Sequence, residues 1–273
     1  MPKILTDEQV AMYHRDGFST AVDVLSPAEV QRFRSSLEAH EARLGHPLAF
    51  PEKSKSYLLF DWADALVHHP RVLDAVEDVI GPDILVYHST MWIKEANTPA
   101  YVLWHQDGTY FFLDPAEHVT AWVALTDATE EAGCVHFIPG SQKLGQLPHY
   151  DAPSENNMIR RGQGVRGYDD QAGVPVPVLA GQLSLHNTNT LHASGPNRAN
   201  HRRMGYGISF IPTRVKPTGR SKPSALLVRG TDRVNHFLPE QRLQREGSPE
   251  AVAAHRDALA LFNALQHEGF APA

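Results

Sequence analysis

The chain has little of what marks several large classes of protein. Its one cysteine among 273 residues, Cys134, cannot form an internal disulfide, which excludes a disulfide-stapled secreted domain. No apolar run approaches the length of a membrane-spanning helix, and the mean hydropathy is −0.34. The first residues show no charged stretch followed by an apolar run and a cleavage site. We therefore expect a cytoplasmic protein that does not bind membranes.

Positive charge is in deficit. Lysine and arginine number 25 against 31 aspartate and glutamate residues, which gives a formal net charge of −6. A field of this sign repels polyanions, so we expect no nucleic-acid partner. The sequence does not indicate an oligomeric state. With 42% hydrophobic residues and no internal repeat, the chain can bury a full core, and we expect a single domain over residues 1–273.

Helix signals fill the first part of the chain, residues 1–82. Serine or threonine followed three residues later by glutamate or glutamine forms capping-box patterns at Thr6 and Ser26, and each predicts a helix start. A third helical run covers about 70–79, and a last helix is expected over about 249–268. We expect the N-terminal helices to form one packing layer.

From residue 84 the pattern changes to short runs rich in β-branched and aromatic residues, separated by Gly, Pro, Asn and Asp. Such runs predict strands, and their spacing after a helical block is typical of a β-sandwich or barrel that helices buttress. The mainly β core should span about 84–215. The expected strands are 84–93, 102–105, 119–125, 135–138, 176–179, 183–185 and 203–210.

A long polar segment interrupts this core from Ser141 to Val174. It contains several glycines and has little apolar periodicity. A loop of this length inside a compact domain is commonly a lid or a binding loop. We expect a mobile lid that orders over the active site when substrate binds.

Three residues have the types and spacing of a metal site. His105 and Asp107 are two apart on a predicted strand, so their side chains share a face. His192 is the best candidate for a third ligand from a distant strand. Two histidines and one carboxylate form the facial arrangement of non-haem Fe(II) oxygenases, which leaves positions open for oxygen chemistry. A His-x-Asp motif alone also occurs on surfaces and in satisfied cores, so further residues must support this interpretation.

Arg203 supplies that support. It follows His192 by eleven residues and opens a predicted strand. An iron oxygenase that uses a keto-dicarboxylate must hold the acid's far carboxylate, and a guanidinium offers a planar, permanently charged fork for it. A simple metal-binding barrel has no need of a buried guanidinium behind its metal site. The joint pattern therefore favours an enzyme.

Together these motifs resemble the phytanoyl-CoA dioxygenase family of Fe(II)/2-oxoglutarate-dependent oxygenases. The resemblance covers most of the chain to about Pro212, and it implies a double-stranded β-helix, the jelly-roll barrel of cupin-like proteins. The matching segments are residues 13–18, His105-Gln-Asp107, Trp122 in Ala-Trp-Val-Ala-Leu, residues 131–143, and residues 192–197 with Arg203.

The resemblance also implies roles for individual residues. His105, Asp107 and His192 would bind Fe(II), and Arg203 would bind the C5 carboxylate of 2-oxoglutarate, with O2 as the other cosubstrate. Halogenating relatives replace the carboxylate ligand by a small residue, whereas this chain keeps Asp107. The retained ligand favours hydroxylation, desaturation or ring chemistry over halogenation.

Other positions near these motifs are candidates for holding the cosubstrate. Gln106, Trp122 and Ser194 match family positions that contact 2-oxoglutarate or order the site. Lys94 is either a second cation for the cosubstrate or the substrate, or a charge on an edge strand. His186 is not assigned to the metal, because the asparagines that follow it make an unbroken strand to His192 doubtful.

Candidate substrate contacts are the least determined part of the site. The aromatic residues among them are equally typical of a core, the arginines of a solvated loop, and the histidine of a satisfied interior position. They are His88, Tyr110, Phe112, Asn187, Arg160 and Arg161.

The function expected from the sequence is hydroxylation of an unactivated C–H bond of a small metabolite, with release of succinate and CO2. An amino acid, an amine, a phosphonate or a secondary-metabolite scaffold would suit. Two alternatives stay open. One is an acyl-CoA hydroxylase of the same family, although the sequence shows no basic cluster suited to the phosphates of coenzyme A. The other is a non-enzymatic, cupin-like protein that binds a metal or a small molecule.

Overall fold

Two facing β-sheets form the centre of the computed structural model, which describes residues 1–159, 163–168 and 172–270. The larger sheet has the order β1-β10-β5-β12-β2-β14-β15, and the smaller has the order β3-β11-β6-β9. All pairs are antiparallel except β14 with β15. The strands of the larger sheet are β1 (Val22–Asp23), β10 (Gln182–Asn187), β5 (Val119–Ala124), β12 (Arg203–Pro212), β2 (Ile84–Lys94), β14 (Ser224–Arg229) and β15 (Leu238–Pro239); those of the smaller are β3 (Val102–His105), β11 (His192–Ser194), β6 (Val135–Phe137) and β9 (Val174–Val176).

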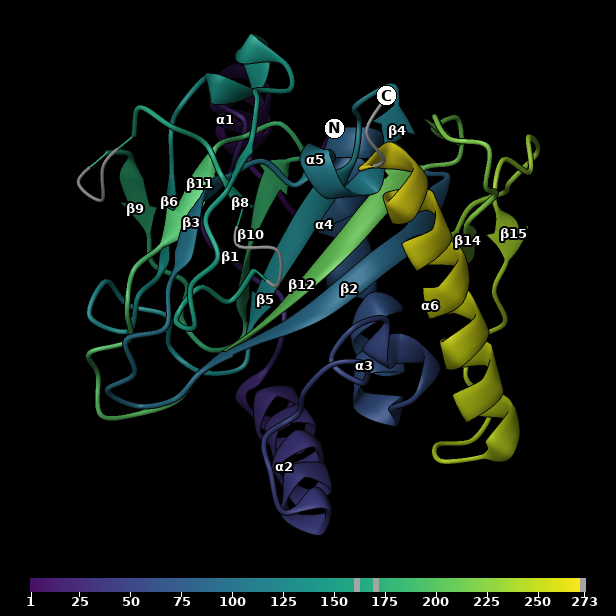
Figure 1. The fold of residues 1–273 in the computed structure, drawn as a ribbon, viewed down its shortest axis with the longest axis horizontal. Coiled ribbons are helices and arrows are strands. Elements are labelled where there is room, and N and C mark those ends of the chain that lie inside the picture. The colour runs from purple at the N-terminus through teal and green to yellow at the C-terminus, as the bar shows by residue number, and fades with distance from the viewer. Residues whose placement is uncertain (160–162, 169–171, 271–273) are drawn as a thin grey trace.

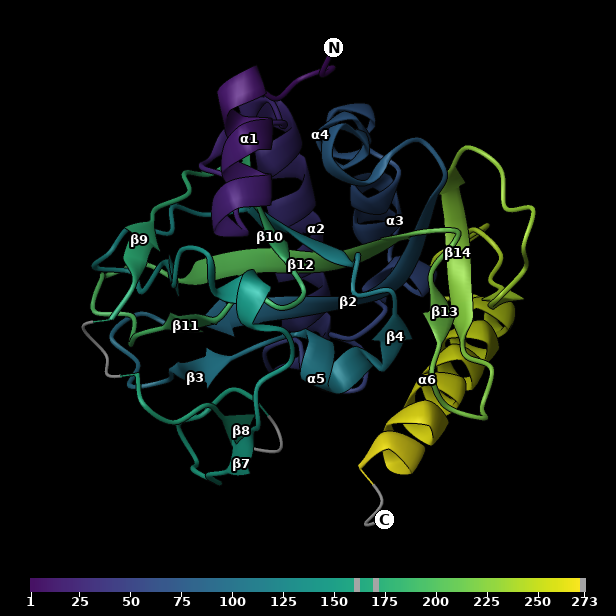
Figure 2. The same ribbon diagram turned by 90° about the horizontal axis from the view of Figure 1, so that it is seen from above.

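Helices cover the face of the larger sheet that is turned away from the smaller one (Figure 2). They are α1 (Asp7–Asp16), α2 (Pro27–Leu44), α3 (Asp61–Val67) and α4 (Pro70–Ile80). Complete capping boxes at Thr6 and Ser26 start the first two, as the sequence predicts. Alternate residues of β5 serve the two faces of the larger sheet. Val119, Ala121 and Val123 pack against the helices. Thr120 and Trp122 therefore point to the opposite face, toward the smaller sheet.

The C-terminal helix α6 (Pro249–Gly269) packs beside β14 at the other end of the larger sheet (Figure 1). Its Phe262 belongs to a second apolar cluster with Tyr87 and Phe111. The short helix α5 (Gly108–Phe111) directly follows the His-x-Asp motif, and Gln266 of α6 donates a hydrogen bond to the Tyr110 carbonyl at 3.2 Å. The C-terminal helix therefore supports the turn that carries Asp107.

The expected jelly-roll fold is confirmed, with two differences. The sheets face each other but do not close into a barrel. The strand expected at 176–179 is β9, at Val174–Val176, because only that part pairs with β6, and Leu179 is 50% exposed. Helices α3 and α5 and several strands, among them β11 and β14, were not predicted. No helix of the described ranges is both long and apolar enough to cross a bilayer.

The segment from Ser141 to Val174 contains more structure than its polar sequence suggests. It begins with a 3-10 helix, Ser141–Leu144, and includes the paired strands β7 (Tyr150–Asp151) and β8 (Gln163–Gly164). The Val165 amide donates to the Trp104 carbonyl at 2.7 Å, and Ile159 and Val165 are each 8% exposed. The described part of this segment is therefore held against β3, which its polar sequence does not indicate. Its opening and closing stay a prediction.

Candidate metal and cosubstrate site

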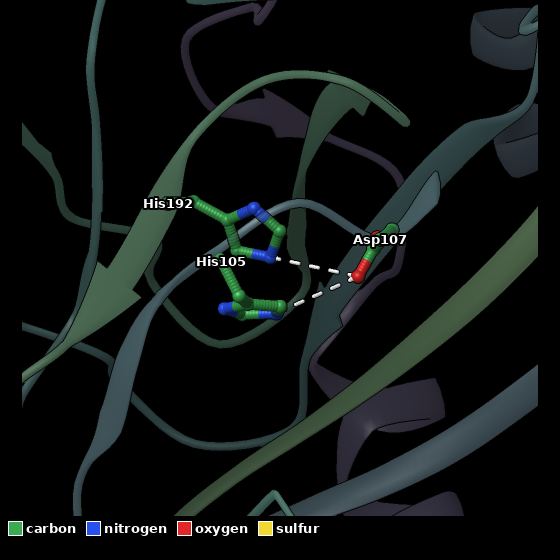
Figure 3. A group of neighbouring side chains, drawn as sticks. All are labelled: His105, Asp107 and His192. Carbon is green, nitrogen blue, oxygen red and sulfur yellow. Dashed lines mark ion pairs between the residues drawn. The ribbon is translucent and has the colours of Figure 1, made fainter. Parts of the chain in front are cut away.

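His105, Asp107 and His192 converge between the two sheets (Figure 3). His105 ends β3 and His192 begins β11, and the two are direct partners in the register of these strands. One Asp107 oxygen, Oδ1, lies 3.6 Å from His105 Nε2 and 3.7 Å from His192 Nε2. One ligand atom from each residue lies within 4.8 Å of the others, which suits one ion at bond lengths of about 2.1 Å.

Backbone carbonyls fix which nitrogen each histidine offers. His105 Nδ1 lies 2.8 Å from the Leu103 carbonyl and His192 Nδ1 lies 2.9 Å from the Thr190 carbonyl. A carbonyl accepts only, so both Nδ1 atoms carry the proton and both Nε2 lone pairs point toward Asp107. Burial, with His105 and His186 nearby, holds the pKa of His192 well below its ordinary value. The imidazole is therefore neutral at pH 7, as a metal ligand must be.

The other Asp107 oxygen is occupied. Oδ2 accepts a hydrogen bond from the Thr120 hydroxyl at 2.7 Å, and His186 Nε2 lies 3.2 Å from it. Although burial alone would raise it, the surrounding histidines hold the pKa of Asp107 well below its usual value, so the carboxyl is ionised. His186 lies outside the group of three candidate ligands, and its strand β10 ends at Asn187 before β11 begins at His192, as expected; its Nε2 nevertheless reaches Asp107.

Two buried cations lie deeper between the sheets. Arg203 and Lys94 are register partners on β12 and β2, with exposed fractions of 1% and 0%. Lys94 Nζ donates to the Ser194 carbonyl and hydroxyl and to the Gly195 carbonyl, whereas Arg203 Nε and Nη1 are buried and have no partner in the described part of the chain. Burial, reinforced by Arg203, lowers the pKa of Lys94 to about 6. Burial of this degree excludes an edge-strand charge for Lys94, and no carboxylate of the described ranges pairs with Lys94 or Arg203.

A small cavity of about 50 Å³ connects this end with the metal ligands. Its lining includes all three ligands together with Arg203, Ser194 and Trp122. Arg203 Cζ lies 5.1 Å from the centroid of the Trp122 ring. That ring can lie against β12 only because residue 205 is glycine: a Cβ there would come within 1.8 Å of Trp122 Cζ2. The structure thus brings together most of the residues predicted to hold iron and a dicarboxylate.

Of the two roles expected for Gln106, contact with the cosubstrate or ordering of the site, its position fits the second. Its amide nitrogen donates to the Gly145 and Asn189 carbonyls at 2.8 and 2.6 Å, and its oxygen accepts from the Leu147 amide at 2.7 Å. The side chain is fully used in tying these loops to the His-x-Asp turn, and it does not line the cavity. Gln106 therefore orders the site from outside and does not contact the cosubstrate space.

None of the candidate substrate residues lines the metal cavity within the described ranges. His88 stacks on Phe262 of α6 at 4.2 Å, and the Tyr110 ring lies 6.2 Å from the ring of His105. The Asn187 side chain accepts from the Asn189 amide at 2.9 Å, and Phe112 lines a separate cavity beside α5. Arg160 and Arg161 lie outside the described residues.

Sequence reasoning missed three residues that surround Asp107. They are Thr120, His186 and His118, which has Nε2 3.2 Å from Thr120 Oγ1. A usable signal existed for two of them, because positions 118 and 120 alternate with Trp122 on the same strand face. For His186 the signal was weaker, since it required recognising the strand that ends at Asn187.

Comparison with known proteins gives relatives of one kind. A probable alpha-ketoglutarate-dependent hypophosphite dioxygenase of Stutzerimonas stutzeri is 28% identical over 163 residues, 59% of this chain and 57% of that protein. Phytanoyl-CoA dioxygenase domain-containing protein 1 of Rattus norvegicus is 33% identical over 151 residues, 54% of this chain and 52% of that protein. The matched region thus spans about half the length of these curated relatives.

A solved structure extends the likeness to nearly the whole chain. The apo form of ThoJ, described as a non-haem monooxygenase, superimposes with a TM-score of 0.84 at 34% identity and covers 96% of this chain and 98% of its own. The phytanoyl-CoA dioxygenase (PhyH) family matches residues 13–205. These residues contain the three candidate ligands, Lys94, Trp122 and Arg203. This chain therefore belongs to the phytanoyl-CoA dioxygenase family.

Proposed function

We propose that this protein is an Fe(II)/2-oxoglutarate-dependent oxygenase that hydroxylates an unactivated C–H bond of a small metabolite, with release of succinate and CO2. One observation carries the proposal: the His105, Asp107 and His192 triad shares a cavity with Arg203, whose Nε and Nη1 are buried and find no partner among the described residues. A buried, unpaired guanidinium is costly unless an anion joins it. The far carboxylate of 2-oxoglutarate is such an anion.

Each residue would have a distinct task. His105 and His192 would bind the iron through Nε2 and Asp107 through Oδ1, and iron bound there supplies the activation of O2. Arg203 would hold the far carboxylate, and that anion would in turn favour the protonated form of Lys94 beside it. Trp122, at 4% exposure, closes the wall of the cavity against water.

The proposed substrate class depends on the relatives and on the lining of the metal cavity. The curated relatives carry names as different as a hypophosphite dioxygenase and a phytanoyl-CoA dioxygenase domain protein, and the chain matches about half of each. Among the described residues that line the metal cavity, Arg203 is the single lysine or arginine, which leaves no basic cluster for the phosphates of coenzyme A. This favours an amino acid, an amine, a phosphonate or a secondary-metabolite scaffold over an acyl-CoA.

Two other classes of function fit the site less well. A halogenase needs the carboxylate position free for a halide, and Asp107 fills it with Oδ1 between the two histidines. A cupin-like binding protein without catalysis does not explain the unpaired Arg203. Hydroxylation is therefore preferred, with desaturation and ring chemistry as variants of the same site.

A succinate-release assay tests the proposal. Protein loaded anaerobically with Fe(II) is mixed with 2-oxoglutarate and a panel of metabolites, and succinate is measured after O2 is admitted. His192→Ala should abolish 2-oxoglutarate turnover and sharply weaken iron binding while leaving the fold intact. His201→Ala is the control, because His201 lines a separate cavity beside α2 and its Nε2 lies 3.0 Å from the Asp127 carbonyl oxygen. Iron binding and turnover in His192→Ala equal to the parent would overturn the ligand assignment.

A further inference from the structure

Behind the ligand Asp107 stands a buried chain of polar side chains that the proposed chemistry does not use. His118, Thr120 and His186 are 0%, 6% and 2% exposed. Thr120 and His186 are direct partners in the register of β5 and β10, and both reach the same Asp107 oxygen, Oδ2. His118 lies behind Thr120, with Nε2 3.2 Å from Thr120 Oγ1.

The direction of these hydrogen bonds follows from what each group can do. An ionised carboxylate only accepts, so the single Thr120 hydroxyl proton points to Oδ2 and His186 donates from Nε2. The Thr120 oxygen must then accept from His118 Nε2. Burial lowers the pKa of His118 to about 4, so at neutral pH this ring has one proton to give, and Nε2 holds it. The chain thus runs one way, from His118 through Thr120 to Asp107.

We infer that Thr120, held by His118, and His186 are positioning residues that fix the Asp107 carboxylate so that only Oδ1 faces the metal. The inference rests on the proposed function. Two donors on Oδ2 oppose rotation of the carboxylate about its Cβ–Cγ bond, and a single oxygen on the ion leaves the neighbouring coordination position for the keto acid. Without them Oδ2 is free to turn toward the ion and compete for that position.

His186 is a donor in this arrangement and not a fourth ligand. Its Nε2 faces Oδ2, on the opposite side of the carboxylate from the oxygen that faces His105 and His192. The group of potential ligand atoms within 4.8 Å of one another contains the three ligands alone among the described residues. The larger sheet therefore supplies the support, and the smaller sheet with its adjoining turn supplies the ligands.

Co(II) binding tests the inference without turnover. Thr120→Val keeps the shape of the side chain and removes both hydrogen bonds, and Thr120→Ser restores the hydroxyl. Ser184→Ala is the matched control, because Ser184 is fully buried on neighbouring β10 and its hydroxyl has no partner in the described ranges. His118→Phe removes the donor behind Thr120 without touching Asp107. The dissociation constant and the visible spectrum of bound Co(II) are measured in the absence of 2-oxoglutarate.

We expect Thr120→Val to raise the Co(II) dissociation constant at least tenfold and to change the spectrum, because His186 alone then holds Oδ2 and the orientation of the Asp107 carboxylate is less fixed. Thr120→Ser should stay within threefold of the parent, Ser184→Ala should equal it, and His118→Phe should lie between. If Thr120→Val does not fold, His118→Phe and Thr120→Ser decide. The inference is overturned if both Thr120→Val and His118→Phe keep the affinity and spectrum of the parent. Where Thr120→Val does not fold, parent-like behaviour of His118→Phe alone overturns it. A loss of affinity in Ser184→Ala equal to that in Thr120→Val also overturns it. A parent protein that binds no Co(II), or binds it equally after His192→Ala, overturns the proposed function instead.

Discussion

Arg203 and Lys94 face each other across the β12–β2 pair, both buried, and no carboxylate of the described chain pairs with either. Two positive charges at this depth are unfavourable in the free protein, because burial penalises charge and each repels the other, and the lowered pKa of Lys94, about 6, reflects this. The site thus has a strong preference for an anion at this position. Three of the predictions below depend on that preference.

Replacing Arg203 should weaken 2-oxoglutarate binding. Both Arg203→Ala and Arg203→Lys should raise the KM for 2-oxoglutarate at least tenfold, about 1.4 kcal/mol, because each loses the guanidinium fork. Arg202→Ala is the control, since Arg202 points the other way to Glu41 and Glu95. The succinate-release rate against cosubstrate concentration gives the KM. An unchanged value in both Arg203 variants would move the anchor to another cation, such as Arg198.

Removing the Lys94 amine should make the protein more stable and weaken its binding of 2-oxoglutarate. Lys94→Met should raise the melting temperature, because the unfolded lysine holds its proton up to about pH 10.5 whereas the folded one releases it above about pH 6. The unfolded state binds more protons between these values, so the parent's stability increases with pH there. The gain in the variant should therefore be largest below pH 6 and shrink toward pH 10.

The same variant should bind 2-oxoglutarate more weakly, since the ammonium beside Arg203 is gone. Thermal unfolding in the absence of cosubstrate from pH 6 to 9, together with the KM for 2-oxoglutarate, measures both effects. Ser194→Ala, which removes one acceptor of the Lys94 ammonium, is a useful comparison. A melting temperature that falls in Lys94→Met at every pH would mean that the three hydrogen bonds outweigh the cost of burial.

A methyl group at residue 205 should disturb the cosubstrate pocket. In Gly205→Ala the new Cβ would overlap the Trp122 ring, and Arg203 lies against the same ring. Overpacking of this kind costs about 1–3 kcal/mol of stability, and we expect a higher KM for 2-oxoglutarate as well. Gly195→Ala is matched to it, because a Cβ there meets no described atom within 4 Å. Equal behaviour of the two variants in thermal unfolding and in KM would contradict the close packing.

The segment from Ser141 to Val174 should respond to ligands. We expect trypsin to cut within it in the iron-free protein, and iron, 2-oxoglutarate and substrate together to slow the cleavage. Fragment masses locate the cuts. Equal cleavage with and without ligands, or complete resistance of the free protein, would indicate a static surface loop. The Val165 amide donates to the Trp104 carbonyl, so the segment cannot open beyond this contact unless the hydrogen bond breaks.

The sequence predicts an element well when the interactions that form the element lie within a few residues of each other. The starts of α1, α2 and α6 were predictable because a capping side chain lies within three residues of the helix. Helix α3 has no side-chain cap, and β11 is three residues long and exists through its pairing with β3 and β6. The order of the strands came from resemblance to a family, since no run of residues encodes which distant strand it will pair with.

The site divides in the same way. His105 and Asp107 were predictable from their spacing, and His192 and Arg203 from the chemistry that the first two require. Thr120 and His186 belong to the site because β5 and β10 align them opposite each other, which the sequence does not state. Gln106 is the opposite case: its place in sequence between His105 and Asp107 suggests a site residue, but its side chain points into the loops behind them.

The adjacency of His105 and His192 on β3 and β11 also bears on how the smaller sheet unfolds. An ion bound by both would act as a cross-link between strands that are far apart in sequence, in the manner of a removable disulfide. It would restrict the unfolded chain most over the intervening segment, which includes β5, β6 and β10. Metal-free protein would then exchange the amide hydrogens of the smaller sheet sooner than those of β12 and β2, and added metal would bring the two rates together.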